Sequence, residues 1–245
     1  MLDINLQAEY VIDLFGFYVT NTFLTTLVAS FLLIFLATTL YAYRDNKKNF
    51  FVKSWQITIY ELLKLTDYVT GDRKLSKKIF PIVATLFLFV FVTNLIALIP
   101  GFLGSFYVDI NDEHLSLFRS PNSDLTTTSA LAIIAVFSIQ YFSVKMIGLA
   151  NYIKKFFNLS GFLPFILGLF EAMSELLRIL SFSFRLFGNV FAGEVLLTVI
   201  LFITPLILPV PFMVLEVFVS VIQAFIFCIL TLTFIRLSVS KHLVG

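Results

Sequence analysis

The chain has 245 residues, of which 59% are hydrophobic, 17% aromatic and only 13% charged. Soluble domains carry roughly 25% charged residues, so this composition indicates an integral membrane protein. Lys and Arg number 17 against 15 Asp and Glu, and the resulting net charge of +2 gives no strong field for attracting nucleic acid. The single cysteine, Cys228, excludes an internal disulfide and a cluster of thiolate metal ligands.

Long apolar runs predict five to six membrane helices within a single membrane domain, residues 1–245, because a helix needs about 20 apolar residues to cross the ~30 Å hydrocarbon core. The first span is predicted at 20–43. A basic, amphipathic segment at 44–78 follows it, and we expect a helix there on the cytoplasmic membrane surface. Residues 79–127 hold the second span and a polar outer loop, and 128–155 hold the third span and a basic link.

The C-terminal part of the chain, 161–236, is predicted to form a tilted hairpin of two long helices. The apolar stretch from Gly161 to about Pro205 is longer than one upright span needs, so it forms either one strongly tilted helix or two short ones. A last apolar run extends from Phe212 to about Ile235. The expected fold class is therefore an all-α integral membrane protein.

Basic residues predict the orientation in the membrane. With five crossings, 14 of the 17 bases fall on one side: nine in 44–78, three in 145–155 and two in the C-terminal tail. Only Arg119 falls on the opposite side. Positive loops stay in the cytoplasm, so we expect the N-terminus outside and the C-terminus inside. Two bases, Arg178 and Arg185, lie within the fourth apolar stretch.

A charged residue in the middle of a span costs on the order of 2.5 to 3.5 kcal/mol, so each one suggests a function. Six such residues lie in the last two apolar stretches: Glu171, Glu175, Arg178, Arg185, Glu194 and Glu216. A stripe on the first helix has spacings of three or four: Glu171, Ser174, Glu175, Arg178, Ser181, Arg185 and Asn189. Glu216, Ser220 and Gln223 form a shorter stripe on the last helix. A proton or another ion could pass between the two stripes.

A purely structural interpretation stays open for part of the longer stripe. Glu175 and Arg178 are three residues apart and can simply neutralise each other. Arg185 differs, because no carboxylate lies within one turn of it and its guanidinium keeps its charge. Its counter-charge must come from another helix or another chain. The nearby Gly188 and Gly193 would let a neighbouring helix approach closely.

The sequence predicts no catalytic residue, metal site or cofactor-binding site. His114 and His242 both fall outside the predicted spans, which leaves no histidine to hold a haem within the membrane. The chain also lacks a glycine-rich phosphate loop, a nucleophile elbow and a metal-spaced cluster of histidines or cysteines.

Residues 181–194, with the sequence SFSFRLFGNVFAGE, resemble the signature of subunit a of the F-type ATP synthase. The resemblance continues at 223–225, 121–124 and 94–95, and it covers most of the chain from about residue 79 onward. It implies a stator subunit that conducts protons through two offset half-channels to and from a rotating ring of c subunits. It also implies that this subunit is not catalytic.

The resemblance assigns roles to single residues. Arg185 matches the family's essential arginine, which faces the ring carboxylate, makes it release its proton and blocks a direct leak between the half-channels. Positions lining the proton path near that arginine and the outer half-channel correspond to Asn189, Glu194 and Gln223. Positions associated with the cytoplasmic half-channel correspond to Glu171, Ser174, Arg178 and Ser181, and Glu175 neighbours them.

Two positions depart from the family pattern. Glu216 stands where some bacterial members carry a histidine that works with the residue equivalent to Glu194. The outer half-channel would then use two carboxylates, and we expect them to titrate as a coupled pair. Ala97 replaces an acidic residue of some members, so any contribution from that site is absent.

The implied partners are the c-ring subunits opposite Arg185, peripheral-stalk b-type subunits at the basic segment 44–78, and the lipid bilayer, with no nucleic acid. The expected location is a bacterial plasma membrane, with mitochondrial inner or thylakoid membranes as alternatives. Carboxylates and amides suit H+, although Na+ stays open. An ion-coupled solute carrier is the alternative function, although the halves of the chain show no repeat. A purely structural membrane subunit is a third reading.

Overall fold

The computed structural model of the chain describes residues 10–14, 17–43, 50–99, 107–110, 113–156, 161–204 and 207–240. Some sequence predictions concern other residues. Those for 44–49, for the parts of the outer loop at 100–106 and 111–112, and for 241–245 lie outside the described residues.

Helices make up most of the described chain. They are α1 (Asn21–Ala42), α2 (Phe50–Thr70), α3 (Arg73–Ala97), α4 (Leu125–Ile147), α5 (Leu149–Phe156), α6 (Phe162–Ile203) and α7 (Pro209–Ser240). Among the described residues, five helices are long and apolar enough to cross a membrane, namely α1, α3, α4, α6 and α7. The predicted all-α integral membrane fold is therefore confirmed.

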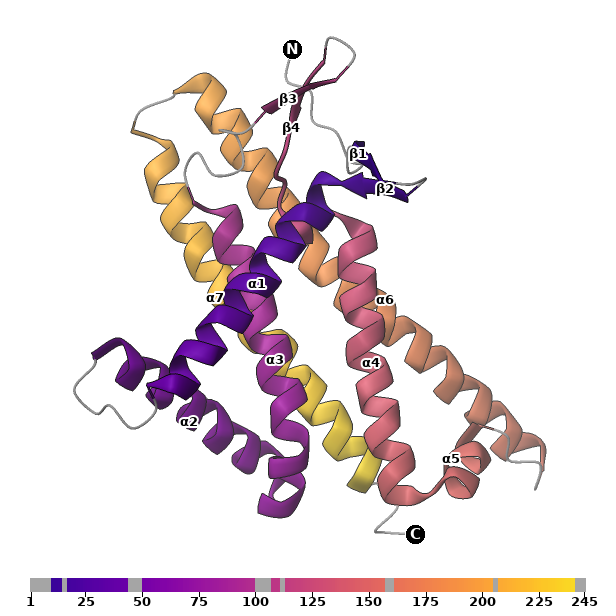
Figure 1. Cartoon of the computed structure of the whole chain (residues 1–245). Helices are drawn as coiled ribbons and strands as arrows, with labels where there is room; N and C mark the ends of the chain where they lie inside the picture. The colour runs from indigo at the N-terminus through magenta and orange to yellow at the C-terminus, as the bar shows by residue number, and fades with distance from the viewer. Residues whose placement is uncertain are drawn as a thin grey trace.

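Two short antiparallel hairpins lie at one end of the molecule (Figure 1). Strands β1 (Tyr10–Leu14) and β2 (Phe17–Thr20) form the first, and β3 (Tyr107–Ile110) and β4 (Glu113–Ser116) form the second. The sequence predicted neither hairpin, and it indicated a polar outer loop at the second one. The opposite end carries α2, α5 and the last turns of α7.

The core forms where α3, α4, α6 and α7 pack together. α4 lies mainly against α6, and α3 lies mainly against α7. Large side chains from all four helices are fully buried there, including Ile79, Ile139, Phe182, Leu186 and Phe227. α1 is more peripheral, because most of its apolar surface stays exposed in this single chain.

The apolar stretch after Gly161 forms one continuous helix, α6, of 42 residues. At 1.5 Å per residue it is about 63 Å long, roughly twice the thickness of the hydrocarbon core. Such a helix fits a bilayer only when it is strongly tilted. Figure 1 shows α6 running obliquely across the molecule, from the end that carries α5 to the end that carries the hairpins.

Two spans begin earlier than their apolar runs indicate, because aspartates cap them. The backbone N–H of Lys74 donates to Asp72 Oδ1 at 2.8 Å, so α3 begins at Arg73. In α4, the N–H of Thr126 donates to Asp124 Oδ1 at 3.1 Å. Side-chain oxygens at this position satisfy the free N–H groups of a first turn, and this lets each helix extend beyond the hydrocarbon core.

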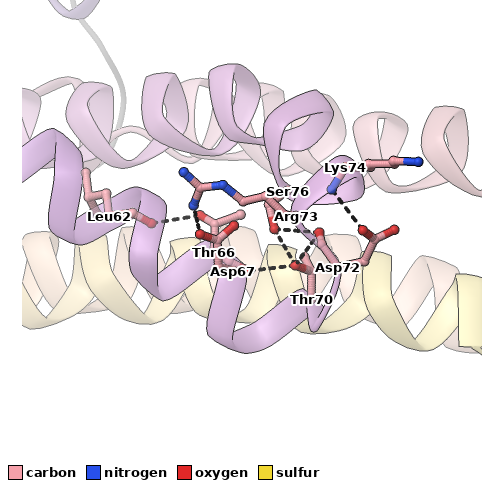
Figure 2. A network of polar contacts seen from close by, with 8 residues as sticks. All are labelled: Leu62, Thr66, Asp67, Thr70, Asp72, Arg73, Lys74 and Ser76. Carbon is pink, nitrogen blue, oxygen red and sulfur yellow. Dashed lines mark hydrogen bonds and ion pairs between the residues drawn. The ribbon is translucent and has the colours of Figure 1, made fainter.

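Polar side chains close the tight corner between the surface helix α2 and the span α3 (Figure 2). Gly71 has a φ of 70°, which favours glycine, and it turns the chain there. The hydroxyl groups of Thr70 and Ser76 lie 2.5 Å apart, and Arg73 forms an ion pair with Asp67 across the corner. These contacts hold α2 at a defined angle to the membrane-spanning helix.

The last turns of α7 contact the same corner. Arg236 Nη1 donates to the backbone oxygen of Val69 at 2.7 Å, close to the C-terminus of α2. Carbonyls at a helix C-terminus lack partners within the helix and attract cations. The surface helix is therefore attached both to the span that follows it and to the last span of the chain.

Candidate functional site

The polar stripe of α6 begins at the end of the molecule that carries α5. Glu171 and Ser174 are half-buried there, and the Ser174 hydroxyl donates to the backbone oxygen of Glu171 at 2.8 Å. The structure thus places both residues on the first turns of the stripe. The serine hydroxyl is engaged with the helix itself in this arrangement.

Glu175 and Arg178 form a nearly buried ion pair one turn further along α6. Arg178 Nη1 lies 2.7 Å from Glu175 Oε2, and the two side chains are 14% and 11% exposed. The guanidinium carbon of Arg178 also lies 4.0 Å from the ring centre of Phe234 on α7, which gives a cation–π contact. The two charges therefore do neutralise each other, as the structural interpretation of the sequence allowed.

A cavity of about 500 Å³ lies beside this ion pair, between α4, α5 and α6. Glu175 lines it together with Gln140 and Tyr152, whose hydroxyl donates a hydrogen bond to the Gln140 side-chain oxygen. Burial, and then the charge of Glu175, raise the pKa of Tyr152 to about 12. Sequence reasoning missed both residues. A glutamine in an apolar run was the one available signal for Gln140.

Arg185 stands in the middle of α6. It is half-buried, and its Nη2 donates to the Ser181 hydroxyl at 3.2 Å. Within the part of the chain that the structure describes, no carboxylate forms an ion pair with it. The space in which a side chain at Gly188 would lie is open. The charge of Arg185 is thus not neutralised by a carboxylate of the described residues.

The two polar stripes meet at Asn189 and Gln223. Asn189 Nδ2 on α6 donates to Gln223 Oε1 on α7 at 2.7 Å, across 34 residues of sequence. Gln223 is buried, whereas Asn189 is exposed on the same side of α6 as Arg185. The bond therefore connects the neighbourhood of Arg185 with the last helix.

Glu194 and Glu216 lie close together toward the end that carries the hairpins. A Cβ atom at Gly193 would come within 2.8 Å of Glu216 Cδ, so the side chain of Glu216 occupies the space that this glycine leaves free. The two carboxyl groups act on each other electrostatically. Ser123 lies within hydrogen-bonding reach of Glu194, and Arg119 is near enough to act on it.

A small cavity of about 10 Å³ is lined by Glu216 and by both partners of the Asn189–Gln223 bond. Its volume suits about one water molecule. Three of its lining residues carry a buried polar atom without a hydrogen-bond partner among the described residues: Asn94 Nδ2, Glu216 Oε2 and Gln223 Nε2. Three convergent polar groups are what a bound water needs, so the cavity can connect Glu216 to Gln223.

The outer loop is anchored to this region through the 3-10 turn η1 (Pro121–Ser123). Asn122 Nδ2 donates to Thr93 Oγ1 at 2.8 Å and to Asn94 Oδ1 at 2.6 Å, and all three side chains are buried. The sequence pointed to Asn94 and Asn122 through the family resemblance alone. It did not reveal Thr93 or the contact itself, because the partners are 28 and 29 residues apart.

The structure thus brings the predicted residues together in two clusters. The first, on the α5 side, contains Glu171, Ser174, Glu175 and Arg178. The second, on the hairpin side, contains Asn189, Glu194, Glu216 and Gln223. Ser181 and Arg185 lie between them along α6. Within the described ranges, no group of three or more histidine, cysteine, aspartate or glutamate side chains is placed to hold a metal ion.

The profile of a protein family described as ATP synthase A chain matches residues 22–236. The chain belongs to this family. It is 37% identical over 169 residues to an ATP synthase subunit a from Moorella thermoacetica, which covers 69% of this chain and 68% of that protein. It is 30% identical over 241 residues to an ATP synthase subunit a from Legionella pneumophila, covering 96% of this chain and 93% of that protein. The family match includes both clusters and Arg185.

Proposed function

We propose that this member of the ATP synthase A chain family serves as the stator of the membrane sector and conducts protons through two offset half-channels. The half-channels meet a rotating ring of c subunits at Arg185. The observation that supports the proposal is the environment of Arg185. This residue is a permanent cation within the membrane, and its one bond among the described residues is to Ser181. A ring carboxylate would supply the missing counter-charge.

In this proposal, the hairpin-side cluster forms the outer half-channel. Glu194 and Glu216 receive protons from the outer solution and titrate as a coupled pair. The small cavity, with a water held by Asn94, Glu216 and Gln223, continues the path toward the Asn189–Gln223 bond. The contact between these groups across α3, α6 and α7 supports a single connected route.

The cytoplasmic half-channel runs along the first half of α6. Glu171, Ser174, Glu175, Arg178 and Ser181 line it in order toward Arg185. Because Arg185 stands between the two clusters, a proton can pass from one half-channel to the other only on the rotating ring. Moving one charge through 100 mV releases about 2.3 kcal/mol, and rotation of the ring makes that energy available to subunits that synthesise ATP. This chain does no catalysis itself.

The expected membrane is a bacterial plasma membrane, with the α2 and α5 end in the cytoplasm. Described bases at that end include Lys53, Lys64, Lys74, Lys77, Lys78, Lys145 and Lys154. This distribution agrees with the positive-inside rule. The relatives from Moorella thermoacetica and Legionella pneumophila support a bacterial origin. Peripheral-stalk b-type subunits would contact the exposed side of α2.

The test is ATP-driven proton pumping in inverted vesicles that carry the full complex, with Arg185→Ala compared to wild type at matched assembly. Lost pumping, with passive proton leak retained or raised, would support Arg185 as the barrier between the half-channels. Lys77→Ala, which removes an exposed cation outside the path, serves as the control and should pump normally. Normal pumping by Arg185→Ala would overturn the proposal and favour an ion-coupled solute carrier.

A further inference from the structure

α6 carries a second arginine on the same face as Arg185. Arg178 precedes Arg185 by seven residues, which in an α-helix places the two side chains within about 20° of each other and about 10 Å apart along the axis. We propose that Glu175 is a positioning residue that neutralises Arg178, so that Arg185 alone presents an uncompensated positive charge to the ring. This inference rests on the function proposed above.

The contacts of Arg178 neutralise its positive charge. Glu175 Oε2 accepts from Arg178 Nη1 at 2.7 Å, and both side chains are almost fully removed from the surface of the chain. The cation–π contact with Phe234 holds the guanidinium from the other side. Arg185 has a different environment, since its described partner is the neutral hydroxyl of Ser181.

Among the described ion pairs, the carboxylate that contacts Arg178 is that of Glu175. Glu171 on α6 and Tyr152 on α5 interact electrostatically with this region. The pKa of Tyr152, raised to about 12, keeps that hydroxyl neutral at physiological pH. Neighbouring side chains from α4 and α7 are Gln140 and Phe234, neither of which ionises. Glu175 is therefore the direct counter-charge of Arg178.

Without Glu175, Arg178 would act on the ring carboxylate in the cytoplasmic half-channel. In this proposal the ring carboxylate meets Arg185, which lies about 10 Å along α6 from Arg178. At that distance and an effective dielectric constant of about 20, a unit charge changes a protonation equilibrium by roughly tenfold. The uncompensated charge of Arg178 would hold the carboxylate ionised at the point where it must take up a proton from the cytoplasm. Proton pumping would slow, and a lower cytoplasmic pH would restore it.

The experiment compares Glu175→Gln with wild type in inverted vesicles carrying the full complex, over a range of external pH. We expect about tenfold slower ATP-driven pumping near neutral pH. We also expect the external pH of half-maximal pumping to move down by about one unit, a shift that a simple loss of stability does not produce. Adding Arg178→Gln to Glu175→Gln removes the uncompensated charge, and it should return the external pH of half-maximal pumping to the wild-type value.

The matched control is Glu61→Gln, which removes the acidic partner of an exposed pair with the same spacing, Glu61 with Lys64 on α2. It should leave pumping unchanged. A wild-type pH profile in Glu175→Gln, or a double variant with the same pH shift as the single one, would overturn the inference. Arg185→Ala is measured in the same vesicles. If it pumps normally, the proposed function itself fails, and that outcome is distinct from failure of the Glu175 inference.

Discussion

At the residue scale, position 193 requires glycine because a neighbouring side chain occupies the space of a Cβ atom, not because of the backbone conformation. The carboxyl group of Glu216 on α7 fills the place of the missing side chain. Gly188, one and a half turns earlier on the same helix, has no atom within 4 Å of the corresponding position. The two glycines look alike in the sequence, but only Gly193 allows two elements of this chain to approach closely.

Gly193→Ala should therefore destabilise the purified chain in detergent by about 1 to 3 kcal/mol, because the added methyl group forces Glu216 to move. Gly188→Ala is the matched control. It should unfold at the wild-type temperature or slightly higher, because alanine favours the helix. The measurement is the thermal unfolding temperature of both variants and of the wild type. Equal stability of the two variants would show that the contact between Gly193 and Glu216 is not tight.

Tyr152 offers a titration that can be followed in solution. Its folded pKa of about 12 lies above the ordinary value of 10, so the neutral form contributes stability that is fully present below pH 10. That stability is lost as pH rises through the folded value. Tyr152→Phe should remove the loss of stability that ionisation of Tyr152 causes at alkaline pH. Proton pumping should continue at neutral pH. Spectroscopic titration of tyrosinate checks the prediction, and an ordinary pKa for this residue would contradict it.

At the element scale, α6 and α7 carry the polar path, and the η1 turn sets its outer boundary. α6 is long because no proline interrupts it between Pro164 and Thr204. It can therefore present both clusters and Arg185 on a single rigid element. η1 is short, but Asn122 inserts its side chain against α3 and leaves Ser123 next to Glu194.

Asn122→Leu should reduce both the stability of the complex and its pumping. Loss of the two hydrogen bonds leaves Asn94 unsatisfied in a buried place, at a cost of about 1 to 3 kcal/mol. The outer loop would then no longer hold Ser123 against Glu194. Asn151→Leu on α5, which removes an exposed hydrogen bond to Ile147, should have little effect. Similar losses of stability and pumping in both variants would exclude a specific role for the Asn122 hydrogen bonds.

At the scale of the whole molecule, the surface helix α2 is held by its corner with α3 and by Arg236 from α7. Its outward side carries exposed lysines, Lys53 and Lys64 among them. A rigidly attached basic helix outside the core of the bundle is a suitable platform for a second subunit. This is the position at which we expect the peripheral stalk.

Charge reversal by Lys53→Glu together with Lys64→Glu should weaken the association of b-type subunits, with a larger effect at low salt because exposed charges are screened at high salt. The measurement is the amount of b-type subunit that co-purifies with the chain. Lys154→Glu on α5 is the control, since it changes an exposed base at the same end of the molecule. Unchanged co-purification of the double variant would place the stalk elsewhere.

The sequence by itself determined the membrane class and limited the number of spans to five or six. It also located the charged residues that lie within the apolar stretches. Apolar run length and the cost of burying charge are local properties, and each can be evaluated without knowing the fold. Helical spacing also indicated that Glu175 and Arg178 could pair, because such a pair needs only one turn of helix. The sequence did not distinguish one long helix from two over 161–205.

Only the tertiary structure decided which distant groups meet. Asn189 with Gln223, Asn122 with Asn94, and Glu216 over Gly193 are all contacts between elements that are far apart in sequence. Helical periodicity predicts which face a residue occupies, but not which helix covers that face or at what angle. Those relations depend on how the side chains of α3, α4, α6 and α7 pack together, because the packing of the whole bundle sets the position of every helix at once.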